Sequence, residues 1–443
     1  MEAVFTQPLP VLLPPEAQFR CPDEPHTITR SVHLARLAAF YPKCRHCQHR
    51  HDTGHLPPTV VEQIQDVERQ RAPQRSLFQT DGVRGVFHNE LTPAIAGRMA
   101  GALASLLWEA VPLTARRSSS GSVVKRSGPM VGIGYDERPA SPVLFAMVAD
   151  SLRMMGCEVV DLGQLSRACF IFAVDHLQAA GGVLVTGAGC DASWNGLDLV
   201  SDGAMPLSFG TGLEEVERRL QDGYSRPTRR AGFQRAYQPL VPYEPSLWKH
   251  FHALRPLKIV AAIRPRTTRE TLRRLASKLP CEFTEIETMA GSHAPIRHSA
   301  LLASITQRVS RSAAHLGVLI DDDGCRCQFL DEKGRLIEAA RLGAFLASSL
   351  IAGNPHATIA VKSADLEDQM RRLKSGNLID AGETTGSLAQ AMRNSGAVLG
   401  IASNDTCWWR ESCPTPDAIL TLARVLQALS RSDAPFSAVL PKH

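Results

Sequence analysis

Short apolar runs alternate with longer amphipathic segments along most of the chain. Runs of strand length occupy residues 130–134, 157–163 and 182–186, and a segment of helical spacing covers 141–155. A helix is also predicted over 94–108, directly after a threonine and a proline that suit a helix start. Strands separated by helices indicate βαβ units and a mostly parallel sheet.

The same alternation restarts twice toward the C-terminus. It predicts strands over 257–263, 316–320 and 357–361, and helices over 267–279, 339–351 and 415–429. We therefore expect an α/β protein of three consecutive α/β/α domains with mixed, mostly parallel sheets. The expected domain bounds are 76–240, 241–337 and 338–443, preceded by a Cys/His-rich extension over 1–75.

Composition narrows the protein class only modestly. A length of 443 residues predicts two to four domains, and the net charge of +5 does not favour a nucleic-acid partner. No apolar run approaches about 18 residues, and prolines interrupt the first segment, so we expect neither a membrane span nor a secretory signal. Eleven cysteines, an odd number without a disulfide-like spacing, indicate reduced thiols and a cytoplasmic location.

The N-terminal extension carries one metal-like motif. Cys44 and Cys47 form a C-x₂-C pair, a spacing that lets two thiolates reach one tetrahedral zinc ion. Cys21 is the candidate third ligand, and the fourth would come from a neighbouring histidine: His26, His33, His49, His51 or His55. The alternative is a reduced, partly ordered His-rich tail.

Two loops in the first predicted domain have the residue types of an anion site. Glycines flank Asp81 and Arg84, which suits a tight loop that presents the guanidinium to an anion, or a turn in which the two side chains pair. Asp136 and Arg138 follow a predicted strand, at the edge where parallel sheets bind ligands.

An acidic cluster follows the predicted strand over 316–320. Asp321, Asp322 and Asp323 would repel one another unless a hard cation such as Mg²⁺ neutralised them, or unless they formed a solvated acidic turn. The chain thus offers one candidate magnesium site beside two candidate anion loops.

In this order, the motifs resemble those of the α-D-phosphohexomutases, most closely the phosphoglucosamine mutase and phosphomannomutase branch. The resemblance covers roughly 76–440 and is carried by residues 80–85, 89–93, 134–138, 195–197, 316–317, 324–326 and 331–334. It implies isomerase chemistry of carbohydrate metabolism, in which a phosphoryl group moves between hexose C6 and C1 through a phosphoserine, with Mg²⁺ as counter-charge.

The resemblance also exposes departures at the phosphoserine loop. The family pattern Ser-Ala-Ser-His-Asn-Pro aligns with residues 186–191, so Ala188 falls at the acceptor position and Gly189 replaces the histidine. Thr186 and Ser193 are nearby hydroxyls, but in-line transfer tolerates displacements of only about an ångström. Asn195 matches the Asn-Gly that follows the loop in the family.

The metal loop departs from the family pattern in the same way. Asp321, Asp323 and Arg326 match Asp-Gly-Asp-Gly-Asp-Arg, while Cys325 replaces the third carboxylate. A thiolate is a soft ligand poorly suited to Mg²⁺. We therefore expect magnesium binding to be weak or absent.

In the third predicted domain, the sugar-binding loop of the family aligns with residues 400–406. Ser403 and Thr406 are then the candidate sugar contacts, and Ala402 replaces the glutamate. We interpret the similar stretch 382–387 as a coincidence. Two adjacent tryptophans, Trp408 and Trp409, either form a stacking platform for a ring or pack in the core.

We expect no fourth domain, because the phosphate loop that it carries in the family has no counterpart here. The sequence therefore favours a pseudoenzyme that retains phosphosugar or anion binding through Arg84, Asp136, Arg138 and Arg326, in a regulatory or scaffolding role. The alternative is an active, divergent phosphohexomutase with another acceptor and a partner chain that supplies the missing domain. A protein partner or a homo-oligomer fits either reading.

Overall fold

The computed structural model describes residues 19–22, 24–39, 41, 43–44, 47–69, 76–110, 128–288, 296–373, 376–402 and 404–441. The chain divides into two compact units, Met1–Ser76 and Leu77–His443. The Ser/Arg-rich stretch over 113–129, which its composition predicts to be a surface loop, lies almost wholly outside the described residues.

The N-terminal unit is small. Strands β1 (Phe19–Arg20) and β2 (Thr27–Ile28) pair antiparallel, and helix α1 (Arg30–Ala38) follows. The Thr29 side chain accepts a hydrogen bond from the Val32 amide and so caps α1, as a helix start requires. Helix α2 (Pro58–Arg69) completes the described part of this unit.

The larger unit begins with a sheet in the strand order β10-β6-β5-β7-β8-β4-β3, to which β9 adds beside β8. Its elements in chain order are β3 (Phe78–Gln79), β4 (Gly82–Val86), α3 (Pro93–Ala110), β5 (Met130–Tyr135), α5 (Ser141–Met154), β6 (Glu158–Gln164), α6 (Arg167–His176), β7 (Gly181–Val185), β8 (Trp194–Ser201), the 3₁₀ turn Asp202–Ala204, β9 (Met205–Pro206), α7 (Leu213–Asp222) and β10 (Gln234–Ala236). Strands β10, β6, β5 and β7 are parallel, and the others pair antiparallel.

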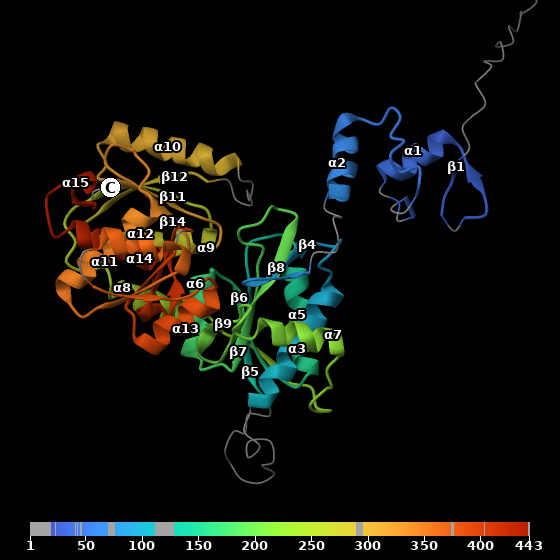
Figure 1. Ribbon diagram of the computed structural model, residues 1–443, viewed down its shortest axis with the longest axis horizontal. Helices are drawn as coiled ribbons and strands as arrows, with labels where there is room; N and C mark the ends of the chain where they lie inside the picture. The colour runs from blue at the N-terminus through green and yellow to red at the C-terminus, as the bar shows by residue number, and fades with distance from the viewer. Residues whose placement is uncertain are drawn as a thin grey trace, which may run out of the picture. The chain divides into compact units, whose positions relative to one another are not determined.

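Alternating side chains of this sheet belong to two different cores. In β7, Val183 and Val185 pack in the cluster that contains the apolar residues of α3 and α5, whereas Leu184 packs with α6. This is the period-2 pattern of a strand covered on both faces. Helices α3, α5 and α7 lie together on one side of the sheet (Figure 1).

A second sheet has the order β12-β11-β13-β14. Its elements are α8 (Leu240–Trp248), β11 (Lys258–Ile263), α9 (Arg266–Ala276), β12 (Glu282–Ile286), α10 (Ile296–Ser312), β13 (Leu316–Ile320) and β14 (Cys327–Leu330). Strands β12, β11 and β13 are parallel and β14 is antiparallel.

A third sheet has the order β16-β15-β17-β18-β19. Its elements are α11 (Ala339–Gly353), β15 (Thr358–Val361), α12 (Ser363–Arg372), β16 (Asn377–Asp380), α13 (Thr385–Ser395), β17 (Leu399–Ala402), β18 (Thr406–Trp409), the 3₁₀ turn Arg410–Ser412, β19 (Thr415–Pro416), α14 (Ala418–Leu429) and the short α15 (Phe436–Val439). The strands β16, β15 and β17 are parallel, and β18 and β19 are antiparallel.

The predicted α/β class is confirmed. Among the described residues, each of the three sheets of the larger unit combines parallel strands with an antiparallel edge. One continuous core joins α6 to strands of the second and third sheets and to α14, which explains why residues 77–443 form one compact unit. The three domain bounds stay a prediction. Within the described residues no helix combines the length and apolarity needed to cross a bilayer.

Candidate functional site

Two neighbouring strands deliver the loops on which the sequence placed catalytic chemistry. Strands β5 and β7 are parallel, and Tyr135 is paired with Val185 at their carboxyl ends. The loop of Asp136 and Arg138 therefore lies beside the loop over 186–191. This is the edge of a parallel sheet at which α/β proteins present ligand groups.

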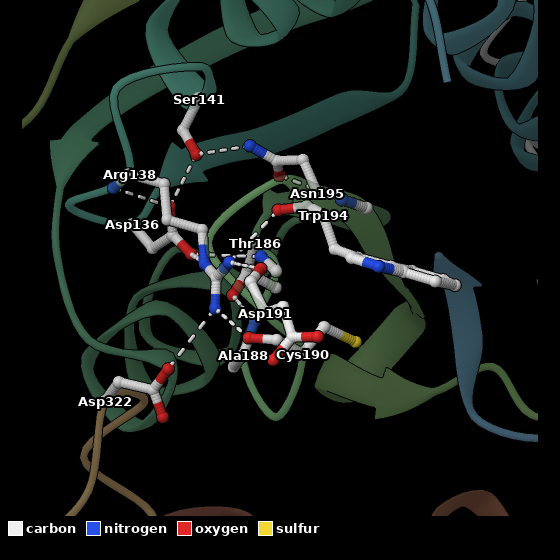
Figure 2. A network of polar contacts seen from close by, with 12 residues as sticks. Asp136, Arg138, Ser141, Thr186, Ala188, Cys190, Asp191, Trp194, Asn195 and Asp322 are labelled. Carbon is white, nitrogen blue, oxygen red and sulfur yellow. Dashed lines mark hydrogen bonds and ion pairs between the residues drawn. The ribbon is translucent and has the colours of Figure 1, made fainter. Parts of the chain in front are cut away.

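Arg138 is the centre of the polar network drawn in Figure 2. Its side chain is only 1% exposed, and its guanidinium donates to the backbone carbonyls of Cys190 (2.8 Å), Asp191 (2.6 Å) and Trp194 (3.1 Å). It also donates to a carboxylate oxygen of Asp322 at 3.3 Å. Arg138 thus holds the 186–191 loop in shape. Its two terminal nitrogens donate to these internal acceptors and its Nε lies 3.4 Å from Asp136 Oδ2, so the expectation that Arg138 binds a ligand anion gains no support.

Asp136 completes the clamp from the other side. Its Oδ2 accepts from the Gly187 amide at 3.0 Å, and its Oδ1 accepts from the Ser141 hydroxyl at 2.5 Å and from the Arg138 amide at 3.1 Å. Asn195 is fully buried and donates to Ser141 at 2.9 Å. Both predicted substrate-binding side chains therefore have internal partners.

Ala188 lies on this clamped loop, partly exposed to solvent. Its amide donates to the hydroxyl oxygen of Thr186 at 3.0 Å, and Thr186 is buried, with 2% of its surface exposed. The neighbouring Gly189 has a φ of +80°, a backbone conformation that suits glycine. The loop therefore presents a methyl group, and the hydroxyl of Thr186 points to its own backbone.

The acidic loop after β13 is bound to arginines. Arg326 Nε pairs with Asp321 Oδ2, Asp322 pairs with Arg138, and the Cys325 amide donates to Asp323 Oδ1 at 2.8 Å. Burial, together with the neighbouring carboxylate of Asp323, raises the pKa of Asp321 well above its ordinary value. Burial also raises the pKa of the Cys325 thiol, which is 1% exposed, so this thiol is neutral.

These residues do not fit a magnesium ion. Mg²⁺ needs octahedral oxygen ligands, and here a neutral thiol stands at the third ligand position of the family pattern. Within the described ranges, no group of three or more His, Cys, Asp or Glu residues is arranged to hold a metal. Two of the three carboxylates of the loop, those of Asp321 and Asp322, are paired with guanidinium groups instead.

A cleft of about 330 Å³ lies over these loops. The phosphoserine-type loop, the acidic loop and the third sheet all contribute to it: its lining is Gly189, Cys190, Asp191, Arg264, Leu319, Asp321, Asp322, Arg326, Gln328 and Asp405. Arg326 is the partly exposed cation of the acidic loop, with 36% of its side chain in solvent. Any polar ligand of this cleft meets both carboxylates and guanidinium groups.

Arg84 lies on β4, and its guanidinium meets a carboxylate that the sequence analysis did not single out. Nη2 of Arg84 is 2.8 Å from Asp198 Oδ1, and Nη1 of Arg167 is 3.5 Å from Asp198 Oδ2. Asp198 is 3% exposed. The sequence left two alternatives for Arg84, binding of a ligand anion or an ion pair with Asp81. Arg84 forms an internal ion pair, but its partner is Asp198.

Asp81, the other charged residue of that loop, binds a helix of the third sheet. Its Oδ1 accepts from Ser208 Oγ at 2.7 Å and from the amide and the hydroxyl of Thr385 at 2.8 Å each. Thr384 and Ser387 form a capping box at the start of α13. The stretch 382–387, interpreted as a coincidence, thus has a structural role, which its Thr-x-x-Ser pattern could have revealed.

The predicted sugar-binding loop is only partly described. Ser403 lies outside the described residues. Thr406 is buried, and its hydroxyl donates to Asn404 at 2.6 Å and accepts from the Trp408 indole at 3.3 Å. Trp408 and Trp409 are 2% and 1% exposed, so the core-packing alternative is confirmed and a stacking platform is excluded.

The three cysteines of the predicted zinc site are buried in the N-terminal unit. Cys21 Sγ accepts a hydrogen bond from Arg36 at 3.1 Å, and the Cys47 amide donates to the Cys44 carbonyl at 3.3 Å. Burial raises the pKa of Cys44. The described part of this unit contains no metal-like group, so the zinc prediction gains no support.

Comparisons with known proteins agree with this architecture. Residues 75–226 match the family model for the phosphoglucomutase/phosphomannomutase α/β/α domain I. The chain is 30% identical over 289 residues to a Xanthomonas campestris pv. campestris (strain B100) protein described as phosphohexose mutases, which covers 63% of this chain and 59% of that protein. It is 24% identical over 393 residues to the phosphoglucomutase/phosphomannomutase of Thermococcus kodakarensis, covering 83% and 80% of the two chains.

A solved structure shows the same fold. A phosphoglucomutase/phosphomannomutase family protein from Burkholderia thailandensis superposes with a TM-score of 0.70 at 23% identity, covering 83% of this chain and 80% of that one. Residues 75–226 therefore match domain I of the phosphoglucomutase/phosphomannomutase family, and most of the chain is similar in sequence and fold to phosphohexomutases. It spans about three-fifths of the length of the Xanthomonas relative.

Proposed function

We propose that this chain is a phosphohexomutase-family protein without phosphoryl-transfer activity, acting as a regulatory or scaffolding subunit that binds a phosphosugar or a similar anion. One observation carries the proposal: Ala188 stands at the acceptor position of a loop whose backbone is clamped by Asp136 and Arg138. A methyl group has no oxygen to accept phosphate, and the clamp prevents a neighbouring residue from taking its place.

The nearby hydroxyls support the proposal. Thr186 is buried and its oxygen accepts from the Ala188 amide, so an in-line attack from it would require the loop to be rebuilt. Ser193 is exposed five positions beyond Ala188, beyond the Asp191 carbonyl that Arg138 holds. Phosphoryl transfer depends chiefly on positioning and charge stabilisation, and both are altered here.

The charge balance of the cleft supports the same conclusion. Asp321 and Asp322 are paired with Arg326 and Arg138, so guanidinium groups already offset much of the charge that a cation would otherwise neutralise. Arg264 and Arg326 line the cleft and are the candidate anion contacts. This differs from the set expected from the sequence, because Arg84, Asp136 and Arg138 have internal partners.

The test is incubation of the purified full chain with glucose 1,6-bisphosphate, followed by intact-mass and peptide mass spectrometry. We expect no phosphorylated residue and no mutase turnover. The matched variant Ala188→Ser restores the hydroxyl on the same clamped loop, and acquisition of one phosphate by this variant alone would show that position 188 is the only missing acceptor. A stable phospho-Thr186 or phospho-Ser193 in the wild type, with turnover that is lost on its replacement, would establish the active divergent mutase instead.

Binding is measured separately by calorimetry with the same bisphosphate. We expect binding that weakens about tenfold in Arg326→Gln and in Arg264→Gln, because each variant removes a charged contact. Arg311→Gln, on α10 outside the cleft lining, is the control. Undiminished binding in both cleft variants would remove the cleft from the proposal.

A further inference from the structure

Two guanidinium groups converge on one buried carboxylate in the first sheet. Arg84 comes from β4, Arg167 from the first turn of α6, and Asp198 from β8 between them in space. Each oxygen of Asp198 faces a different arginine, Oδ1 at 2.8 Å from Arg84 and Oδ2 at 3.5 Å from Arg167. The three side chains are 4–17% exposed, so the contact is largely shielded from solvent.

Two glycines next to this contact, Gly82 and Gly196, leave space for it. Gly82 has a φ of +141°, and a Cβ there would lie 3.1 Å from Asp198 Oδ1. A Cβ at Gly196 would lie 1.9 Å from the Val83 carbonyl oxygen and 2.8 Å from Arg84 Cδ and Nη1, so the missing side chain lets β4 and its arginine lie close against β8. Glycines therefore open room both for the carboxylate and for one of its cations.

The position of Arg167 is fixed independently of Asp198. Its amide donates to the Asp323 carbonyl at 3.3 Å, at the start of a helix capped by Ser166. Burial lowers the pKa of Arg167, but the nearby carboxylates of Asp198 and Asp323 outweigh it, so the pKa is raised. Asp81 is already bound by Ser208 and Thr385, which leaves Asp198 as the carboxylate in direct ion-pair contact with Arg167.

We infer that Arg84 and Arg167 form an oxyanion seat, that is, an anion-binding site made of two guanidinium groups, and that the carboxylate of Asp198 occupies it. Carboxylate- or phosphate-type ligands therefore cannot bind there. The two guanidinium groups provide the positive charge that such an anion needs in a buried place, and they act on Asp198 as ion pairs, because neither of its oxygens has a hydrogen-bond partner among the described residues. The inference deepens the proposed function and rests on it for its meaning: an anionic ligand cannot pair with Arg84 or Arg167 while Asp198 is in place.

The test is chemical rescue of Asp198→Ala in the full chain. This substitution removes a carboxylate and leaves a space the size of formate between the two arginines. We expect the melting temperature of the variant to fall and then to rise by about 2 °C in sodium formate relative to sodium chloride at equal ionic strength, as a ligand that binds only the folded state requires. The wild type should show no difference between the two salts.

Asp198→Asn is the matched control, because it removes the same charge but fills the space with an amide. We expect no formate rescue in this variant, nor in Asp198→Ala combined with Arg84→Gln. Equal stabilisation of the alanine and asparagine variants would show general screening of charge and would overturn the seat. Absence of any formate effect on a folded Asp198→Ala protein would overturn it as well.

If Asp198→Ala does not accumulate as folded protein, Asp198→Ser is tested in the same way, since its hydroxyl keeps an acceptor for one arginine while still vacating an oxygen position. The same two salts and the same outcomes apply to it. Because this readout is thermal and uses no turnover, failure of the seat leaves the phosphorylation experiment untouched, and the discovery of a phosphorylated residue would leave the formate result standing.

Discussion

Asp81 and Thr385 lie 304 positions apart in the chain, yet one carboxylate oxygen of Asp81 accepts both the amide and the hydroxyl hydrogen of Thr385 at 2.8 Å. A loop that the sequence assigned to anion binding thus binds the first turn of α13. The carboxylate is placed where the unpaired amides and the dipole of a helix start favour negative charge.

Replacement of Asp81 should therefore destabilise the larger unit. Asp81→Ala removes the acceptor of Ser208 and of both Thr385 donors, and we expect a loss of about 2 kcal/mol in the free energy of unfolding. Asp81→Asn keeps one oxygen and should cost about half as much. Urea unfolding measures both. Asp150→Ala, which removes an exposed pair with Arg153, should change stability by less than about 0.5 kcal/mol, and an equal effect at both sites would contradict the helix-binding role.

Arg138 should be indispensable for the shape of the 186–191 loop. Arg138→Met leaves three carbonyls and the Asp322 carboxylate without this donor, and we expect a loss of about 3–5 kcal/mol. Hydrogen exchange of the loop amides should accelerate more than exchange in α5. Arg153→Met is the control, because it makes the same substitution at an exposed arginine. In this variant the amides of the 186–191 loop should exchange hydrogen as fast as in the wild type. Unchanged loop protection in Arg138→Met would refute the clamp.

Magnesium should not stabilise the wild-type protein, because guanidinium groups are already paired with Asp321 and Asp322 and a thiol replaces the third carboxylate. We expect its melting temperature to change by less than about 1 °C on adding Mg²⁺ or a chelator. Cys325→Asp restores the third carboxylate, and Mg²⁺ should then raise the melting temperature by about 2–3 °C. Cys325→Ser serves as the control. A clear rise of the wild-type melting temperature with Mg²⁺ would mean that the metal displaces the arginines from the acidic loop, and it would contradict this prediction.

His250 should make stability depend on acidity. Its pKa is lowered from 6.5 to about 4, chiefly by burial and then by the nearby charge of Arg424, while Glu411 opposes the shift and Lys249 and His252 add to it slightly. The unfolded chain therefore binds the proton first, so stability is complete above about pH 6.5 and falls as the pH drops toward about 4.

We expect His250→Gln to remove about 1–2 kcal/mol of this acid sensitivity, measured as urea unfolding at several pH values. The exposed His252→Gln should leave the slope as it is. A wild-type slope that persists in full in His250→Gln would assign the acid sensitivity to other groups.

Most of the regular structure could be predicted from the sequence. The strands over 130–135 and 316–320 are apolar runs of five or six residues, and a fully buried parallel strand has this local signature. Helix α14 begins at Ala418 rather than near 415, because Thr415 and Pro416 pair with β18 and Asp417 caps the helix. Such a boundary depends on a pairing partner that local pattern does not contain.

The candidate site was predictable in its location but not in its interactions. Ala188 and Cys325 can be recognised from the sequence alone, because a missing hydroxyl or carboxylate is a property of the residue itself. The partners of the charged residues cannot. Arg84 with Asp198, and Arg138 with Asp322, are pairs between residues more than a hundred positions apart.

The sequence by itself determined the α/β class, the order of the loops and the loss of the acceptor oxygen, because periodicity and side-chain chemistry are local. Only the tertiary structure decided which charges are free. Buried guanidinium and carboxylate groups must be neutralised where they lie, and that depends on which strands become neighbours. In this protein the neighbours of Arg84, Arg138 and Arg326 are its own carboxylates.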